Sequence, residues 1–250
     1  MRKLIFVLLL AGCAGADWVA PDDFQYVPIK TESYEIATWQ KINNSKNNHI
    51  HIYIEGDGNA FDSYGRPTDN PTPRGTFMRD LATSDDFENV VYIARPCQFI
   101  MDDKCSVVDW TEGRFSQKVI DAESRVIKQI AKNKKISLIG YSGGAMVSGL
   151  VIKQNTKLKV EKWITVAGVL NHKKWTKYFG DEPLTKSLDM EKLPNVPQTH
   201  FVGGRDDVVP YELAKTWADE KNIKLVPKAR HDDFGGLKIF DLKNMFFMIK

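Results

Sequence analysis

Hydrophobic runs alternate with amphipathic segments along most of the chain, and the alternation becomes regular after about residue 88. The run 90–94 is apolar throughout, as strands tend to be in parallel sheets that are covered on both faces. We predict that this run is a strand. Further strands are predicted at 136–140, 163–167, 199–203 and 223–226.

Segments with helical periodicity separate these strands. Residues 116–132 place their apolar side chains on one broad face, and Ser116 stands where a helix N-cap is expected. Helices are also predicted at 145–155, at 210–221, where a proline is acceptable in the first turn, and from about Gly236 onward. The alternation predicts an α/β fold with a mostly parallel central sheet and helices on both faces.

The beginning of the domain has another pattern. Strands are predicted at 24–30, 34–42 and 49–55, and short polar turns join them. Short connections are typical of antiparallel neighbours, so we expect an antiparallel N-terminal edge. Two long loops, 59–86 and 172–198, interrupt the rest of the domain. Loops of this length are usually functional, and the second could form a small cap.

The first residues carry the pattern of an export signal. Arg2 and Lys3 give a short basic start, and the apolar run 4–10 is too short to span a bilayer. Small residues follow at 11–12. This order is typical of a secretory signal peptide, which we assign to residues 1–12, and it leaves a domain at 24–250 behind a short tether.

Residues 10–13, which read Leu-Ala-Gly-Cys, resemble the lipobox of bacterial lipoproteins. In that family the cysteine receives a diacylglyceryl group, cleavage precedes it and the new terminus is acylated. The resemblance implies a lipid on Cys13, a tether at 13–23 and export to a bacterial membrane. Several acyl chains make such an anchor stable. With Ala14 next, the implied location is the outer membrane, facing the periplasm. An ordinary signal peptide with a chance cysteine and an uncleaved anchor are the alternatives.

Charge argues against a nucleic-acid partner. The chain has 35 Lys and Arg residues against 32 Asp and Glu residues, and cleavage before Cys13 would remove two of the bases and none of the acids. The remaining balance is nearly neutral. A protein that neutralises many phosphates needs a basic excess.

Two further cysteines, Cys97 and Cys105, stand eight positions apart. An exported compartment is oxidising, so we predict a disulfide that closes a small loop. Two unpaired thiols are the alternative. A metal site is not expected here, because neither a histidine nor a third cysteine nearby completes a ligand set.

The chemistry is indicated by residues 140–144, which read Gly-Tyr-Ser-Gly-Gly between a predicted strand and a predicted helix. A nucleophile at a sharp strand-to-helix turn needs small neighbours, which Gly140 and Gly144 supply. The turn would raise the Ser142 hydroxyl above the sheet and aim the N–H of Gly143 at the reaction centre. There the helix N-terminus adds positive charge for an oxyanion. A glycine-rich turn with an idle serine is the alternative.

The region from about 49 to 240 resembles the α/β-hydrolase superfamily, through the glycine-flanked turn, an aspartate four positions before Pro210, and a late histidine. The resemblance implies the order nucleophile, acid, base. Asp206 follows a predicted strand, and His231 is the only one of the five histidines after it. A serine nucleophile needs a base and an orienting carboxylate. We therefore predict a triad of these two residues with Ser142.

The superfamily places its second oxyanion donor after the strand predicted at 49–55, commonly in a His-Gly-x sequence. This chain has Glu-Gly-Asp-Gly at 55–58. Because the donor is a backbone N–H, the change of side chain need not matter. We expect the donors to be Gly143 and Asp57, with Gly58 as the alternative to the latter.

Other residues permit two interpretations. Residues 94–98, with 110–111 and 114–115, resemble a group of exported bacterial hydrolases. In the first of these segments, Arg95 and Gln98 follow a strand at the end where open sheets bind ligands, so they either contact substrate or support the loop.

Several histidines and aromatic residues elsewhere also permit two interpretations. His49 and His51 share one face of a strand that we place near the sheet edge, where solvated side chains are favoured over a metal pair. Trp175, Tyr178 and Phe179 either line an acyl pocket or pack a cap onto the core.

Together these features predict a serine hydrolase that cleaves carboxylic esters or thioesters through an acyl-enzyme on Ser142. Its expected substrate is a small-molecule or lipid ester, and we expect no cofactor and no metal. An acyltransferase with the same triad and a non-catalytic binding lipoprotein are the alternatives, because fold alone does not fix function.

Overall fold

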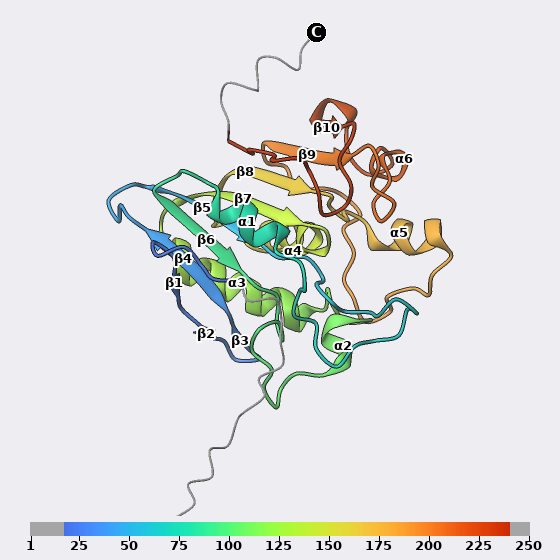
Figure 1. The fold of residues 1–250 in the computed structure, drawn as a ribbon, viewed down its shortest axis with the longest axis horizontal. Coiled ribbons are helices and arrows are strands. Elements are labelled where there is room, and N and C mark those ends of the chain that lie inside the picture. The colour runs from blue at the N-terminus through green and yellow to red at the C-terminus, as the bar shows by residue number, and fades with distance from the viewer. Residues whose placement is uncertain (1–17, 241–250) are drawn as a thin grey trace, which may run out of the picture.

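An eight-stranded sheet lies at the centre of the computed structural model, which describes residues 18–240 (Figure 1). In spatial order its strands are β1 (Gln25–Tyr26), β4 (Thr38–Ile42), β6 (Asn89–Ile93), β5 (His49–Ile54), β7 (Lys135–Tyr141), β8 (Lys159–Val166), β9 (Gln198–Gly203) and β10 (Ile223–Val226). All neighbours from β6 to β10 run parallel, whereas β4 is antiparallel to β6 and β1 is antiparallel to β4. The predicted mostly parallel sheet with an antiparallel N-terminal edge is confirmed.

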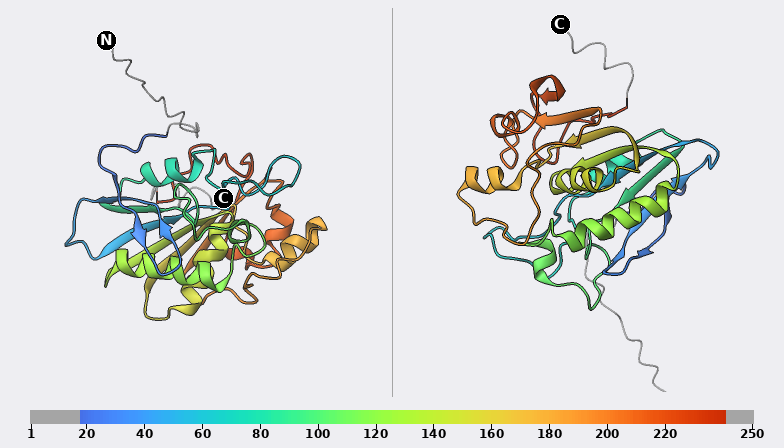
Figure 2. Two further views of the ribbon diagram at one scale, coloured as in Figure 1. Left: turned by 90° about the horizontal axis from the view of Figure 1, so that it is seen from below. Right: turned by 180° about the vertical axis from the view of Figure 1, so that it is seen from behind.

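Helices cover both faces of this sheet, as predicted (Figure 2). α3 (Gln117–Ala131) and α4 (Gly143–Gln154) pack on one face, and α1 (Phe77–Thr83) packs on the other. Side chains alternate along a strand, so β5 sends Ile52 to the α3 and α4 side and Tyr53 to the α1 side.

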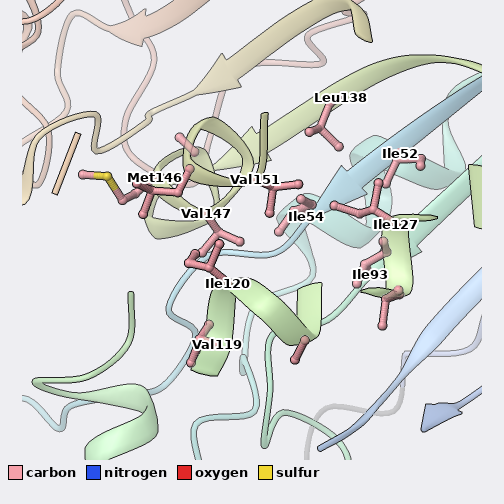
Figure 3. Close-up of a cluster of buried hydrophobic side chains, with 14 of the residues drawn as sticks. Ile52, Ile54, Ile93, Val119, Ile120, Ile127, Leu138, Met146, Val147 and Val151 are labelled. Atoms are coloured by element: carbon pink, nitrogen blue, oxygen red, sulfur yellow. The ribbon is translucent and has the colours of Figure 1, made fainter. Parts of the chain in front are cut away.

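The α3 and α4 side holds the larger core, part of which Figure 3 shows. Fully buried side chains from three parallel strands meet side chains of the two helices: Ile52, Ile54, Ile93 and Leu138 from the sheet, Val119, Ile120 and Ile127 from α3, and Met146, Val147 and Val151 from α4. Each such side chain contributes about 1.5–3 kcal/mol on burial. This packing holds α4, and therefore the turn before it, firmly against the sheet.

Two predicted strands at the N-terminal edge are each divided in two. The segment 24–30 forms β1 and β2 (Ile29–Lys30), which are separated by Pro28, and proline lacks the N–H that a ladder needs. The segment 34–42 forms β3 (Glu35–Ile36) and β4. β2 and β3 pair with each other in a small second sheet, so the chain crosses from one sheet to the other.

Helices differ from prediction where loops or longer helices were expected. The two long loops contain α1 and α5 (His172–Phe179), and a further short helix is α2 (Val107–Trp110). The helix predicted at 210–221 is reduced to α6 (Tyr211–Ala214) and the 3₁₀ turn η1 (Glu220–Asn222).

This shortening follows from the hydrogen bonds after α6. The N–H groups of Thr216 and Trp217 bond to carbonyl oxygens three residues back, so the backbone leaves the α-helical pattern there. The Trp217 side chain packs against the core at this point. The terminal helix predicted from about Gly236 is absent from residues 236–240, which contain a bend and a turn, and its remainder lies outside the described residues.

The predicted disulfide between Cys97 and Cys105 is present, with 5.7 Å between the two Cα atoms. Closing so short a loop stabilises the fold by about 2–3 kcal/mol in the chain-entropy estimate. The proposed signal peptide and Cys13 lie outside the described residues. Within residues 18–240, the helices are too short or too polar to cross a membrane.

Candidate active site

The turn between β7 and α4 holds Ser142 in a backbone conformation with φ of +50°. Its neighbours have no space for a side chain. A Cβ atom on Gly140 would lie 2.5 Å from the carbonyl oxygen of Gly144, and one on Gly144 would lie 2.4 Å from that of Glu55. The small residues that the sequence places here are therefore required by close backbone contacts.

Three side chains from distant parts of the chain meet at this turn. The Nε2 atom of His231 lies 3.0 Å from the Oγ atom of Ser142. Its Nδ1 atom lies 3.0 Å and 3.1 Å from the two carboxylate oxygens of Asp206. This is the geometry in which an imidazole can take a proton from a serine while a carboxylate orients it. The structure thus brings together the three residues predicted as a triad.

Asp206 is held in place by the loop after β9. Its Oδ1 atom accepts hydrogen bonds from the N–H groups of Val208 and Val209, at 2.9 Å and 2.8 Å, and the residue is buried. Asp207 beside it is exposed. The loop therefore presents only the first of the two aspartates to His231.

A cavity of about 1000 Å³ opens over Ser142 and His231. Apolar side chains form much of its lining: Ala60, Phe61, Phe77, Met78, Leu81, Phe115, Val169, Trp175, Phe234 and Leu237. Of the three aromatic residues considered for an acyl pocket, Trp175 lines the cavity. Tyr178 and Phe179 do not line it, and both are exposed.

The peptide between Gly56 and Asp57 borders the nucleophile. A Cβ atom on Gly56 would lie 3.0 Å from that of Ser142. The carbonyl oxygen of Gly56 accepts a hydrogen bond of 3.0 Å from Gln98. Because the peptide is trans, the N–H of Asp57 points away from Gln98. The N–H of Gly143 begins α4 and has no acceptor within the helix.

The side chain of Asp57 lies against the backbone of Gly143, where it leaves no space for a Cβ atom. Two guanidinium groups hold its carboxylate: Nη1 of Arg95 and Nε of Arg114, each at 3.2 Å. Arg95 also donates to the carbonyl oxygen of Arg114. These contacts fix the loop that carries Asp57.

Arg95 and Gln98 therefore support the loop and do not line the cavity. The disulfide closes the same segment, because Cys97 directly precedes Gln98. Arg114 was not singled out from the sequence as a site residue, although it lies in a segment that resembles exported hydrolases. No local pattern distinguishes it from a solvated arginine.

The expectation of solvated histidines on an edge strand was wrong for His51. Its strand, β5, lies in the middle of the sheet. His51 is buried, stacks against Phe87 and Phe240, and lies 2.7 Å from a carboxylate oxygen of Asp85. His49 bonds to Ser137. Residues 18–240 contain no cluster of three or more side chains that could hold a metal.

Solved α/β serine hydrolases have the same fold. A serine hydrolase homologue from Coxiella burnetii is similar with a TM-score of 0.54 and 18% identity over 91% of this chain and 97% of that chain. An esterase from Pyrococcus furiosus gives a TM-score of 0.55 and 16% identity over 83% of each chain. A serine hydrolase without a lid from Xanthomonas campestris gives 0.50 and 13% over 87% of each.

A search of the curated proteins found no match to this sequence. The model of the serine hydrolase (FSH1) family matches residues 83–229, more than half of the chain. The match includes Ser142 and Asp206 and ends two residues before His231. On this match, together with the fold, the chain belongs to the FSH1 serine hydrolase family of α/β-hydrolases.

Proposed function

We propose that this hydrolase cleaves carboxylic esters through an acyl-enzyme on Ser142. The observation that carries the proposal is the continuous hydrogen-bonded arrangement of Ser142, His231 and Asp206 at a largely apolar cavity. An apolar cavity with a few polar groups is typical of small-molecule sites. The esterase from Pyrococcus furiosus, which shares the fold, is consistent with this choice.

In the proposed reaction His231 removes the proton of Ser142 as the serine oxygen attacks the ester carbonyl. Asp206 keeps the imidazole in the tautomer that can accept this proton. The alcohol leaves with the proton from His231. Water then attacks the acyl-enzyme with the same base, which releases the acid and restores the serine.

The negative charge of the tetrahedral intermediates is assigned to the N–H groups of Gly143 and Asp57. Donors that are fixed before the reaction need no rearrangement when charge develops, and a single one contributes about 10²–10³ in rate. The hydrogen bond from Gln98 to the Gly56 carbonyl supports this role, because it fixes the peptide that contains the Asp57 N–H.

The substrate class is tested with nitrophenyl esters of increasing acyl length and the corresponding acyl thioesters of coenzyme A. We expect hydrolysis of the oxygen esters with kcat/KM well above that of the thioesters. A preference for thioesters would contradict the ester assignment and leave the triad unaffected. Added alcohols should give little transfer product, whereas transfer that exceeds hydrolysis would indicate an acyltransferase.

We also propose that the protein is exported and anchored by a lipid on Cys13, with residues 13–23 as a tether. Two features support this location: the lipobox-like sequence at 10–13 and the disulfide between Cys97 and Cys105, which suits an oxidising compartment. Residues 172–198, whose Trp175 lines the cavity, are proposed as a small cap.

Replacing Cys13 with serine should release the protein from the membrane, because the acyl chains that would hold it cannot be attached. Fractionation of cells that express each form checks this, with mass spectrometry of the wild-type N-terminal peptide. The control is the double variant Cys97→Ser and Cys105→Ser, which should stay in the membrane fraction. An unmodified Cys13, or a membrane-bound Cys13→Ser protein, would contradict the anchor.

A further inference from the structure

One buried charged side chain in the cavity wall is neither a member of the proposed triad nor an oxyanion donor, although it holds the side chain of Asp57. Arg114 lies in the loop between α2 and α3, is buried, and lines the cavity. Three aromatic rings surround its guanidinium, with the centroids of Phe61, Phe115 and Trp175 each 5.7 Å from Cζ. These rings line the cavity as well. A guanidinium is thus enclosed by aromatic rings at the cavity wall.

The N–H donors of this guanidinium make no hydrogen bond to the residues that the structure describes. Its Nε atom is fully buried and lies 3.2 Å from the Asp57 carboxylate, as an ion pair without hydrogen-bond geometry. Neither Nη atom donates a hydrogen bond within residues 18–240, and the side chain lines the cavity. A guanidinium has five N–H donors, and it binds carboxylates through two of them at once. The Nη edge of Arg114 is therefore free to accept an anionic group from the cavity.

The groups in direct contact with the two arginines favour an anion at this point of the wall, although the cavity lining as a whole holds more acidic than basic side chains. Arg95 and Arg114 share one carboxylate, that of Asp57. The Glu123 carboxyl lies 3.9 Å from Arg95, but burial raises the pKa of Glu123 to about 8, so this group is mainly protonated at neutral pH. The two guanidinium groups are then in contact with one ionised carboxylate, while Asp181 acts on Arg114 from beyond ion-pair distance. A buried charge without a full counterion is costly, and a substrate anion would supply the missing partner.

We propose that Arg114 binds a carboxylate of the substrate, so that the preferred substrates are esters carrying a free carboxylate, such as half-esters of dicarboxylic acids. This inference rests on the proposed ester hydrolysis at Ser142. The aromatic rings would contact the hydrocarbon between the carboxylate and the ester, and Arg114 would fix its far end. The site would therefore select substrates both by the charge of the carboxylate and by the length of the hydrocarbon between it and the ester.

The test compares matched pairs of esters. The charged members are nitrophenyl half-esters of succinate, glutarate and adipate, and the neutral members have the free carboxylate converted to a methyl ester. A second pair places the charge on the alcohol: the butyrate ester of hydroxybenzoate and that of methyl hydroxybenzoate. We expect kcat/KM to be about tenfold to a hundredfold higher for the charged member of the best pair, as a hydrogen bond between charged groups implies.

Variants locate this preference. In Arg114→Gln the ratio of charged to neutral kcat/KM should fall to near one, whereas Arg114→Lys should retain part of it. Because Arg114 also holds Asp57, the ratio is decisive and the absolute rate is not. Arg74→Gln is the matched control, since Arg74 lines the same cavity but is exposed, and its ratio should match that of the wild type.

A binding measurement avoids variants of Arg114 altogether. In a calorimetric titration, the Ser142→Ala protein should bind the monoamide of glutaric acid, which keeps one carboxylate, at least tenfold more tightly than the diamide, which has none. Equal affinities, a wild-type preference for neutral esters, or a loss of preference in Arg74→Gln as large as in Arg114→Gln would overturn the inference. Absence of all ester hydrolysis and of labelling by a fluorophosphonate would instead overturn the proposed function.

Discussion

Replacing Ser142 with alanine should lower the turnover of esters by about 10⁵–10⁶-fold, because it removes the oxygen that attacks the carbonyl. Labelling by a fluorophosphonate probe should disappear for the same reason. The fold should persist, since the change deletes one oxygen atom and leaves the glycine-flanked turn unchanged. Steady-state kinetics, gel-based labelling and near-ultraviolet circular dichroism of the purified variant measure the three effects.

The matched control is Ser84→Ala. Ser84 borders the same cavity, but its hydroxyl bonds to the carbonyl oxygen of Leu81 and has no histidine partner in the described structure. This variant should label and turn over at nearly the wild-type rate. If Ser142→Ala kept normal turnover, or if the probe reacted at another serine, the proposed mechanism would be wrong.

Changing Asp206 to asparagine should reduce turnover by about 10³–10⁴-fold. The carboxylate accepts a hydrogen bond from the Nδ1–H of His231, which leaves Nε2 unprotonated and able to act as a base toward Ser142. In the variant, Oδ1 can still accept from Val208 and Val209, so the amide N–H₂ would face His231. The ring would then carry its proton on Nε2, where it cannot accept one from the serine.

The adjacent residue provides the control for this prediction. Asp207 is exposed, and Asp207→Asn should change turnover by no more than several-fold. Kinetics of the two asparagine variants under identical conditions distinguish them. An inactive Asp207→Asn together with an active Asp206→Asn would show that the wrong aspartate had been assigned, although a triad of the same kind would remain.

The sequence was most informative where a local pattern is sufficient to locate a strand, or where the order of residues along the chain is sufficient to identify a site residue. Parallel strands that are covered on both faces are apolar along their length, so β6 could be located to within a residue. The order of nucleophile, acid and base in the resembled superfamily left one histidine for the site. The prediction was weaker for α1, which lies in a segment rich in proline and glycine, and for α6, where side-chain packing ends the helix early.

Contacts between distant residues account for what the sequence did not reveal. Gln98 and Gly56 are 42 positions apart, and Arg95 and Asp57 are 38 apart, so no local pattern indicates that one supports the other. His51 looks like a polar residue on a partly exposed strand until the order of strands places it in the centre of the sheet. Arg114 becomes a candidate ligand only when the rings around it are known.

The backbone conformation of Ser142 has a consequence for the balance between stability and activity. A residue other than glycine at φ of +50°, outside the favoured regions, costs about 1–3 kcal/mol. Glycine would avoid this cost, but glycine has no hydroxyl. A domain of this size is stable by only about 5–15 kcal/mol, so the nucleophile uses an appreciable part of the margin. Selection for stability alone would therefore favour loss of the nucleophile, and the serine persists only where its chemistry is needed.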